Sequence, residues 1–215
     1  MCRLLAISVR QPTDMRNHLR QFARIAQNSR EYQGDGWGCA WLEDGHWSIY
    51  KNVCPIWEDN LTDFPATNQL LVHARSAFRN EGIAVENNMP FADDKYAFIF
   101  NGELHGVRIK EQGRIGAEKI FNYIKRFDHG DMLPALEKST GIIAKRTTYI
   151  RAMNIILSDK RFLYLHSLFN EDADYFTMFT KTTENELILC SEKYPGETGW
   201  QKIENETIEG FRCLS

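Results

Sequence analysis

A cysteine at position 2 lies just before the apolar run 4–7, and this arrangement constrains the fold more than any other feature of the sequence. The run predicts a buried strand at the start of the chain. If Met1 is removed, Cys2 carries a thiol and an α-amine together. An α-amine titrates at about 7.7–8.0, so it can accept the thiol proton and leave the more nucleophilic thiolate. Cys2 is therefore either a nucleophile or a small apolar residue that begins a core strand.

The bulk composition favours one globular domain over residues 1–215. The chain is 43% hydrophobic and 26% charged, with no break in composition along its length. A net charge of -3 with dispersed basic residues argues against a nucleic-acid partner. No apolar stretch reaches the roughly 20 residues that span a bilayer, and no signal peptide is evident. We therefore predict a cytoplasmic protein with no membrane partner.

The cysteines predict neither a disulfide framework nor a metal site. There are five of them, an odd number, without a Cys-x-x-Cys pair or a neighbouring histidine cluster: Cys2, Cys39, Cys54, Cys190 and Cys213. A reducing compartment would keep these thiols free, which a thiolate enzyme requires.

Periodicity predicts strands and helices in separate groups. A first helix is expected to begin near Pro12 and Thr13, a second lies around 120–127 and a third at 131–138. Polar composition after Pro195 indicates a loosely ordered tail. Predicted strands cover 4–9, 37–42, 47–50, 69–74, 96–100, 150–157, 161–165, 175–180 and 187–191. This grouping favours an α+β fold over a parallel βαβ sheet.

Three short segments join Cys2 in the order typical of one family. They are Gly-Asp-Gly-Trp-Gly at 34–38, His-Ala-Arg-Ser at 73–76 and Phe-Asn-Gly-Glu at 100–103. Together they resemble the class II glutamine amidotransferases, N-terminal nucleophile hydrolases that cleave the side-chain amide of glutamine. The free-standing members, with a single amidotransferase-like domain, are the most similar. The resemblance implies a four-layer αββα sandwich of two mostly antiparallel sheets, with the first strand at the edge of its sheet.

The same resemblance implies catalytic roles for Cys2, Asn101 and Gly102. Cys2 is the nucleophile, and the Asn101 amide and the Gly102 N–H form the oxyanion hole, where each donor contributes roughly 3–4 kcal/mol. An Asn-Gly pair after an apolar run is also typical of a type I′ hairpin turn, so both interpretations stay open.

The resemblance also implies a set of substrate-binding residues: Arg75, Gly36, Trp37 and Gly102. The forked guanidinium of Arg75 suits the α-carboxylate of the substrate. Alternatively, Arg75 makes an ordinary salt bridge, and Trp37 is a core residue that follows a plain turn.

Three positions depart from the family pattern. Phe78 replaces a threonine that supports the carboxylate, Met89 replaces a histidine, and Gly116 replaces an aspartate that binds the substrate α-ammonium. Loss of that carboxylate would cost about 2–4 kcal/mol of binding unless another residue replaces it. The candidates for the missing carboxylate are Glu118, Glu103 and Glu86, and Arg79 is a candidate to reinforce Arg75.

The sequence therefore predicts an amidohydrolase that cleaves a γ-carboxamide through a γ-glutamyl thioester, without a metal or organic cofactor. Glutamine is the first candidate substrate, with a separate synthase or acceptor subunit as partner. A γ-glutamyl amide or peptide is the alternative substrate. A hypothesis of another class is a catalytically weak regulatory or amino-acid-binding subunit.

Overall fold

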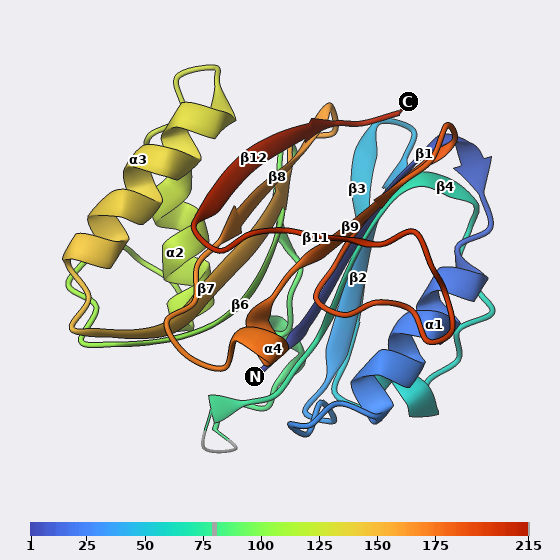
Figure 1. The fold of residues 1–215 in the computed structure, drawn as a ribbon, viewed down its shortest axis with the longest axis horizontal. Coiled ribbons are helices and arrows are strands. Elements are labelled where there is room, and N and C mark those ends of the chain that lie inside the picture. Colours follow the sequence, from blue (N-terminus) through green and yellow to red (C-terminus); the bar gives the residue numbers. More distant parts are fainter. Residues whose placement is uncertain (79–80, 215) are drawn as a thin grey trace.

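Two antiparallel β-sheets lie face to face, and helices cover both outer surfaces (Figure 1). The computed structural model describes residues 1–78 and 81–214. Helix α1 (Arg16–Gln27) covers one sheet, while α2 (Gly116–Lys125) and α3 (Met132–Lys145) lie side by side on the other. The arrangement confirms the predicted α+β, αββα sandwich.

The larger sheet has seven strands, in the order β11 (Gln201–Lys202), β9 (Phe179–Thr182), β10 (Glu186–Cys190), β1 (Arg3–Thr13), β4 (Thr67–Ala74), β2 (Trp37–Glu43) and β3 (His46–Asn52). The smaller sheet has five, in the order β12 (Thr207–Arg212), β8 (Phe162–Ser167), β7 (Tyr149–Ser158), β6 (Ala97–His105) and β5 (Phe91–Ala92). The short helices are α4 (Ala173–Phe176), η1 (Ile56–Glu58) and η3 (Val85–Asn87). No helix of the described residues is long and apolar enough to cross a bilayer.

The apolar run that opens β1 fills two separate cores. Successive strand residues point to opposite faces, so Leu4 and Ala6 pack between the two sheets while Leu5 and Ile7 pack in the core on the α1 side. All four are fully buried. Each fully buried leucine or isoleucine side chain stabilises the fold by roughly 1.5–3 kcal/mol.

Strand β1 lies in the middle of its sheet, so the prediction that it forms an edge is wrong. It pairs with β10 on one side and with β4 on the other. An unbroken apolar run, without polar alternation, suits a strand that is covered on both faces. Cys2 therefore lies at the end of a central strand, near the N-terminus marked between the sheets in Figure 1.

Asn101 and Gly102 lie inside β6, so the hairpin-turn interpretation is wrong. Asn101 pairs with Asn154, and Gly102 pairs with Met153, on the neighbouring strand β7. The glycine serves close packing instead of a turn, because a Cβ at position 102 would lie 2.3 Å from the Ala152 carbonyl oxygen.

Three local predictions also differ from the structure. Pro12 and Thr13 lie in the irregular end of β1, where the register shifts, and α1 begins only at Arg16. The predicted strand at 175–180 is divided between α4 and β9, because Tyr175 and Phe176 turn into the core beside β7. The tail after Pro195 is ordered, since β12 pairs with β8 along six residues.

Candidate active site

Cys2 directly precedes β1, at the edge of the larger sheet where β1 and β2 begin and β4 ends. Its Sγ is 3.8 Å from the carbonyl oxygen of Ser76, which follows β4. Burial raises the pKa of the Cys2 thiol, while the N-terminal ammonium, the Ser76 contact and Arg75 act in the opposite direction. Met1 is still attached here, so the α-amine belongs to a different residue and the thiol favours its protonated form.

Arg75 comes directly after β4 and is only 7% exposed. Its Nη1 donates to Asn88 Oδ1 at 3.2 Å and its Nη2 to the Glu81 carbonyl at 3.4 Å. Burial lowers the pKa of this guanidinium, and the charges of Cys2 and Asp35 oppose the shift. Within residues 1–78 and 81–214, no carboxylate forms an ion pair with Arg75, so its neutral partners leave the charge available to a ligand.

His73 is a fully buried, neutral residue between these groups. Burial, followed by the charges of Arg75, Lys51 and the N-terminus, lowers its pKa to about 3, while the Phe100 backbone acts in the opposite direction. His73 pairs with Leu4 on β1 and with Gly38 on β2, and Gly38 pairs with Lys51 on β3. These positions form one row on the face of the sheet that meets β6.

Asn101 is fully buried, and neither atom of its side-chain amide has a hydrogen-bond partner in the described chain. It directly follows Phe100, whose backbone interacts with His73, so it lies at the level of Cys2 and Arg75. Leaving a buried amide unpaired costs roughly 1–3 kcal/mol. An unpaired amide at this position calls for an explanation, and a bound ligand would supply one.

Gly36 and Trp37, although adjacent in sequence, have different surroundings. Gly36 has φ +112°, and a Cβ there would lie 2.3 Å from the Nδ2 of Asn88, the residue that holds Arg75. Trp37 packs in the core on the α1 side and donates to Asp59 Oδ2 at 2.8 Å. The structure thus brings Gly36, but not Trp37, to the Cys2 face.

The positions that depart from the family pattern lie in different surroundings. Gly116 is exposed at the start of α2, and nothing lies within 4 Å of a Cβ built on it. Phe78 packs edge-on against His105 with ring centroids 5.6 Å apart. Met89 is buried in the layer between the sheets, and Arg79 lies outside the described residues.

The carboxylates suggested as substitutes have other surroundings. Glu118 forms an ion pair with Arg114, and its Oε2 accepts from the Arg114 Nε at 3.0 Å. Glu103 accepts from Arg151 at 3.2 Å and contacts His105 at 2.7 Å. Glu86 is exposed in η3. Neither Glu118 nor Glu103 is free to hold a substrate ammonium without giving up a cation.

Sequence reasoning missed a polar cluster around Met1. Glu31 pairs with the Met1 ammonium, while Gln33 and Tyr175 donate hydrogen bonds to the Met1 carbonyl. Arg151 joins the cluster through Glu31 at 3.0 Å. These residues come from a loop, a short helix and a strand far apart in the chain, so no spacing could have marked them.

The layered sandwich with a thiol at the start of a central strand defines the fold of the N-terminal nucleophile amidotransferases. The chain belongs to the family described as class-II glutamine amidotransferases, whose model matches residues 1–171. No curated protein sequence matches the chain.

Solved structures with this fold include both long and free-standing proteins. Glutamine phosphoribosylpyrophosphate amidotransferase from B. subtilis has a TM-score of 0.68 and 15% identity, and the alignment covers 98% of this chain but 49% of that one. A predicted glutamine amidotransferase from Pseudomonas aeruginosa PA01 has a TM-score of 0.66 and 16% identity over 100% of this chain and 98% of that one. A class-II domain protein from Silicibacter pomeroyi has a TM-score of 0.63 and 15% identity, with full coverage of both chains. This chain thus spans about half of the B. subtilis enzyme, and these similarities establish the fold alone.

Proposed function

We propose that Cys2, once Met1 is removed, cleaves a terminal carboxamide such as that of glutamine. The unpaired amide of Asn101, fully buried beside the Cys2 end of the sheet, carries the proposal. Its natural partner is an oxygen that develops negative charge during the reaction, because a preorganised donor in a buried site stabilises such an oxyanion strongly.

The proposed mechanism uses groups from both sheets, at the Cys2 end of the layer between them. The α-amine of Cys2 accepts the thiol proton, and the thiolate attacks the amide carbon. Asn101 Nδ2 and the Gly102 N–H stabilise the oxyanion of the tetrahedral intermediate. This intermediate collapses to a γ-glutamyl thioester as the Cys2 α-ammonium returns its proton to the departing ammonia, and water then hydrolyses the thioester to glutamate. Arg75 binds the α-carboxylate, and the close approach at Gly36 keeps Asn88 against it.

The setting of the proposed reaction follows from the same chemistry. No step draws on a metal or an organic cofactor, because the thiol, its own amine and the two donors supply nucleophile, base and electrostatic stabilisation. We place the reaction in the cytoplasm, where the Cys2 thiol stays reduced. A separate synthase or acceptor subunit would take up the ammonia.

Intact mass after incubation with 6-diazo-5-oxo-norleucine, a glutamine analogue that alkylates the nucleophile, tests the proposal. We expect loss of Met1 and one adduct that maps to Cys2. The Cys2→Ser variant should lose the adduct, and the matched Cys54→Ser variant should keep it. Retention of Met1, or an adduct on another residue, would contradict the proposal.

A γ-glutamyl amide with a modified amino end is a second candidate substrate. The open, exposed position of Gly116 favours it, because no side chain there offers a charge to an α-ammonium. Steady-state comparison of glutamine with γ-glutamyl amides that carry a blocked α-amine decides between the two substrates. A higher kcat/KM for glutamine would exclude the second candidate. Tight glutamine binding without thioester or ammonia would instead favour a regulatory subunit.

A further inference from the structure

Met1 is held in a site that contacts each part of an amino acid. Its ammonium forms an ion pair with Glu31, and its carbonyl oxygen accepts from Gln33 Nε2 and, at 2.6 Å, from the Tyr175 hydroxyl. Its side chain is 11% exposed and packs on an apolar cluster made of Ala152, Phe169, Tyr175 and Phe176. We call these residues, with Glu31 and Gln33, the Met1 site.

The groups of the Met1 site are fixed by contacts that do not involve Met1. Gln33 is fully buried, and its Nε2 also donates to the Glu31 carbonyl at 2.8 Å and to Tyr175 Oη at 3.1 Å. The Tyr175 ring lies between two guanidinium groups, with Arg3 4.1 Å and Arg30 5.0 Å from its centroid. Because these contacts do not involve Met1, we expect the site to keep its shape when Met1 is removed.

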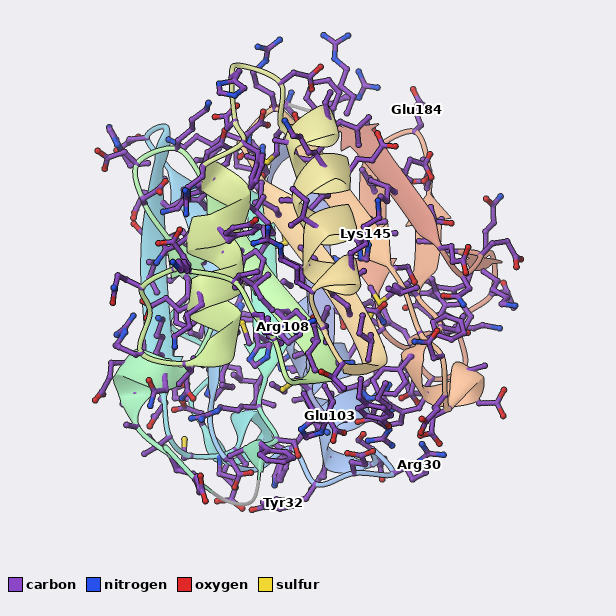
Figure 2. The ribbon with its side chains drawn as sticks, turned by 90° about the vertical axis from the view of Figure 1, so that its left-hand side faces the viewer. Arg30, Tyr32, Glu103, Arg108, Lys145 and Glu184 are labelled. Carbon is purple, nitrogen blue, oxygen red and sulfur yellow. The ribbon has the colours of Figure 1, made fainter. Side chains whose placement is uncertain are left out.

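Removal of Met1 moves the terminal ammonium away from Glu31, in a site that holds several carboxylates. Arg151 is shared by Glu31 at 3.0 Å, Glu103 at 3.2 Å and Asp172 at 2.6 Å. The only other cations in these ion pairs, among the residues described, are the Met1 ammonium and Arg30, with His105 when it is protonated. Figure 2 shows Arg30 and Glu103 at the same end of the molecule. Loss of the Met1 ammonium leaves Glu31 paired with Arg151 alone, which it shares with Glu103 and Asp172, and this favours a new ammonium.

The Cys2 amine is displaced from the position of the lost ammonium. Consecutive Cα atoms are about 3.8 Å apart, so the new N-terminus begins one residue short of Glu31. Hydrogen bonds two residues further along hold the start of β1, and with it Cys2, in place. The Leu4 N–H donates to Ser191 Oγ at 2.9 Å, and the Ser191 N–H donates to the Leu4 carbonyl at 3.0 Å. In addition, Gln33 Oε1 is buried without a hydrogen-bond partner in the described residues, which leaves an acceptor for a ligand.

We propose that the protein without Met1 reversibly binds a free apolar L-amino acid in the Met1 site, and that the bound amino acid shields Cys2. The ammonium pairs with Glu31, the apolar side chain enters the aromatic cluster, and one carboxylate oxygen accepts from Gln33 and Tyr175. The other carboxylate oxygen faces the Cys2 amine, holds it protonated and so prevents it from acting as the base. This regulation rests on the proposed function in one respect, namely that Met1 is removed and the Cys2 amine is the base.

The test uses the full chain released from a cleavable amino-terminal fusion so that Cys2 is the first residue, with the mass verified. Calorimetry with L-methionine should give a dissociation constant below about 1 mM. L-Methionine at 10 mM should slow the alkylation of Cys2 by iodoacetamide at least fivefold. N-acetyl-L-methionine, which has no ammonium, and D-methionine should do neither.

Variants test the charge that carries the proposal. Glu31→Gln should weaken methionine binding at least tenfold, whereas Glu197→Gln, which removes a carboxylate paired with Lys181 at 2.7 Å, should leave it unchanged. The ligand series on the unmodified protein decides the question even if Glu31→Gln fails to fold. No binding and no protection of Cys2 at 10 mM L-methionine overturns the inference.

The two proposals fail separately in this experiment, because neither binding nor alkylation needs turnover. Glutamine cleavage without methionine binding overturns the Met1 site as a ligand site and leaves the proposed function standing. Methionine binding without cleavage of glutamine or of γ-glutamyl amides supports the ligand site and contradicts the proposed function.

Discussion

Buried polar side chains at the two ends of the layer between the sheets differ in their hydrogen bonding. At the end away from Cys2, Ser8 accepts from the Leu214 N–H at 2.9 Å and Gln69 accepts from the Ser158 hydroxyl at 3.1 Å. At the Cys2 end, both amide atoms of Asn101 and the Oε1 of Gln33 have no partner in the described residues. We interpret the paired groups as structural and the unpaired groups at the Cys2 end as candidates for ligand binding.

The largest expected effect tests whether the unpaired end is a catalytic site. Cys2→Ser should lower amide hydrolysis by about 10³-fold or more, because a hydroxyl with a far higher pKa cannot supply the nucleophile. Ammonia release from glutamine, or amine release from a γ-glutamyl amide, measures the loss. Cys54→Ser should retain the activity. If Cys2→Ser remained active, the unpaired groups would have to serve another purpose.

The second prediction exchanges one amide at each end for an apolar side chain. Asn101→Leu should lower kcat by about 10²–10³-fold, as the loss of one oxyanion donor does. The same variant should raise the free energy of unfolding by about 1 kcal/mol, because it removes an unpaired buried amide. Activity assays and urea denaturation measure the two effects.

Gln69→Leu is the matched change at the other end of the layer. It should lower the free energy of unfolding by about 1–3 kcal/mol, because it leaves the Ser158 hydroxyl and the Lys160 carbonyl without their partner. Its kcat should stay within a few fold of the original. If Asn101→Leu and Gln69→Leu changed the free energy of unfolding in the same direction, the proposed difference between the two ends would be wrong.

The third prediction concerns the charge at the Cys2 end. Arg75→Met should raise KM for the substrate about 30-fold, a loss of roughly 2 kcal/mol, with little change in kcat, because a carboxylate contact is present in both ground and transition states. Arg75→Lys should give an intermediate KM, since a point charge replaces a fork. A fall in kcat at constant KM would remove Arg75 from the substrate-binding role.

The sequence predicted the fold well where local pattern and burial coincide. The run 4–7 predicted a buried strand, and the helical spacing of Ile120, Phe121 and Ile124 predicted α2, whose apolar face is buried. The predictions were wrong where contacts between residues distant in sequence determine the local structure. Asn101 and Gly102 have turn chemistry, but pairing with β7 keeps them in a strand. The polar tail is ordered because Ile208 and Phe211 pack on the core as β12 pairs with β8.

The sequence predicted only those candidate site residues that belong to short local motifs. Short motifs marked Cys2, Arg75 and Asn101. Cys2 and Arg75 adjoin β1 and β4 of the larger sheet, and Asn101 lies on β6 of the facing sheet. The sequence also suggested Trp37, but this side chain packs in the core on the α1 side. A motif gives a residue's position along a strand but not its face, and residues one position apart point to opposite faces. Glu31 and Tyr175 could not be found, since only the fold brings residues 31 and 175 to Met1.

The last prediction concerns stability against pH at the two ends of the layer. The folded pKa of His73 is about 3, below the unfolded value of roughly 6.5, so the unfolded chain takes up a proton that the folded chain does not. The stability from keeping His73 neutral is therefore present above pH 6.5 and is lost as the pH falls towards 3, at about 1.4 kcal/mol per pH unit. Carboxylates titrate mostly below pH 5, which leaves pH 6.5 to 5 as the window for His73 and for His166, whose burial also lowers its pKa. His73→Leu should flatten the urea-denaturation stability in this window, and the exposed His129→Leu should not. Equal slopes of stability against pH for the original protein and His73→Leu would mean that His73 takes up a proton in the folded state. The Cys2 end would then carry an additional positive charge in this pH range.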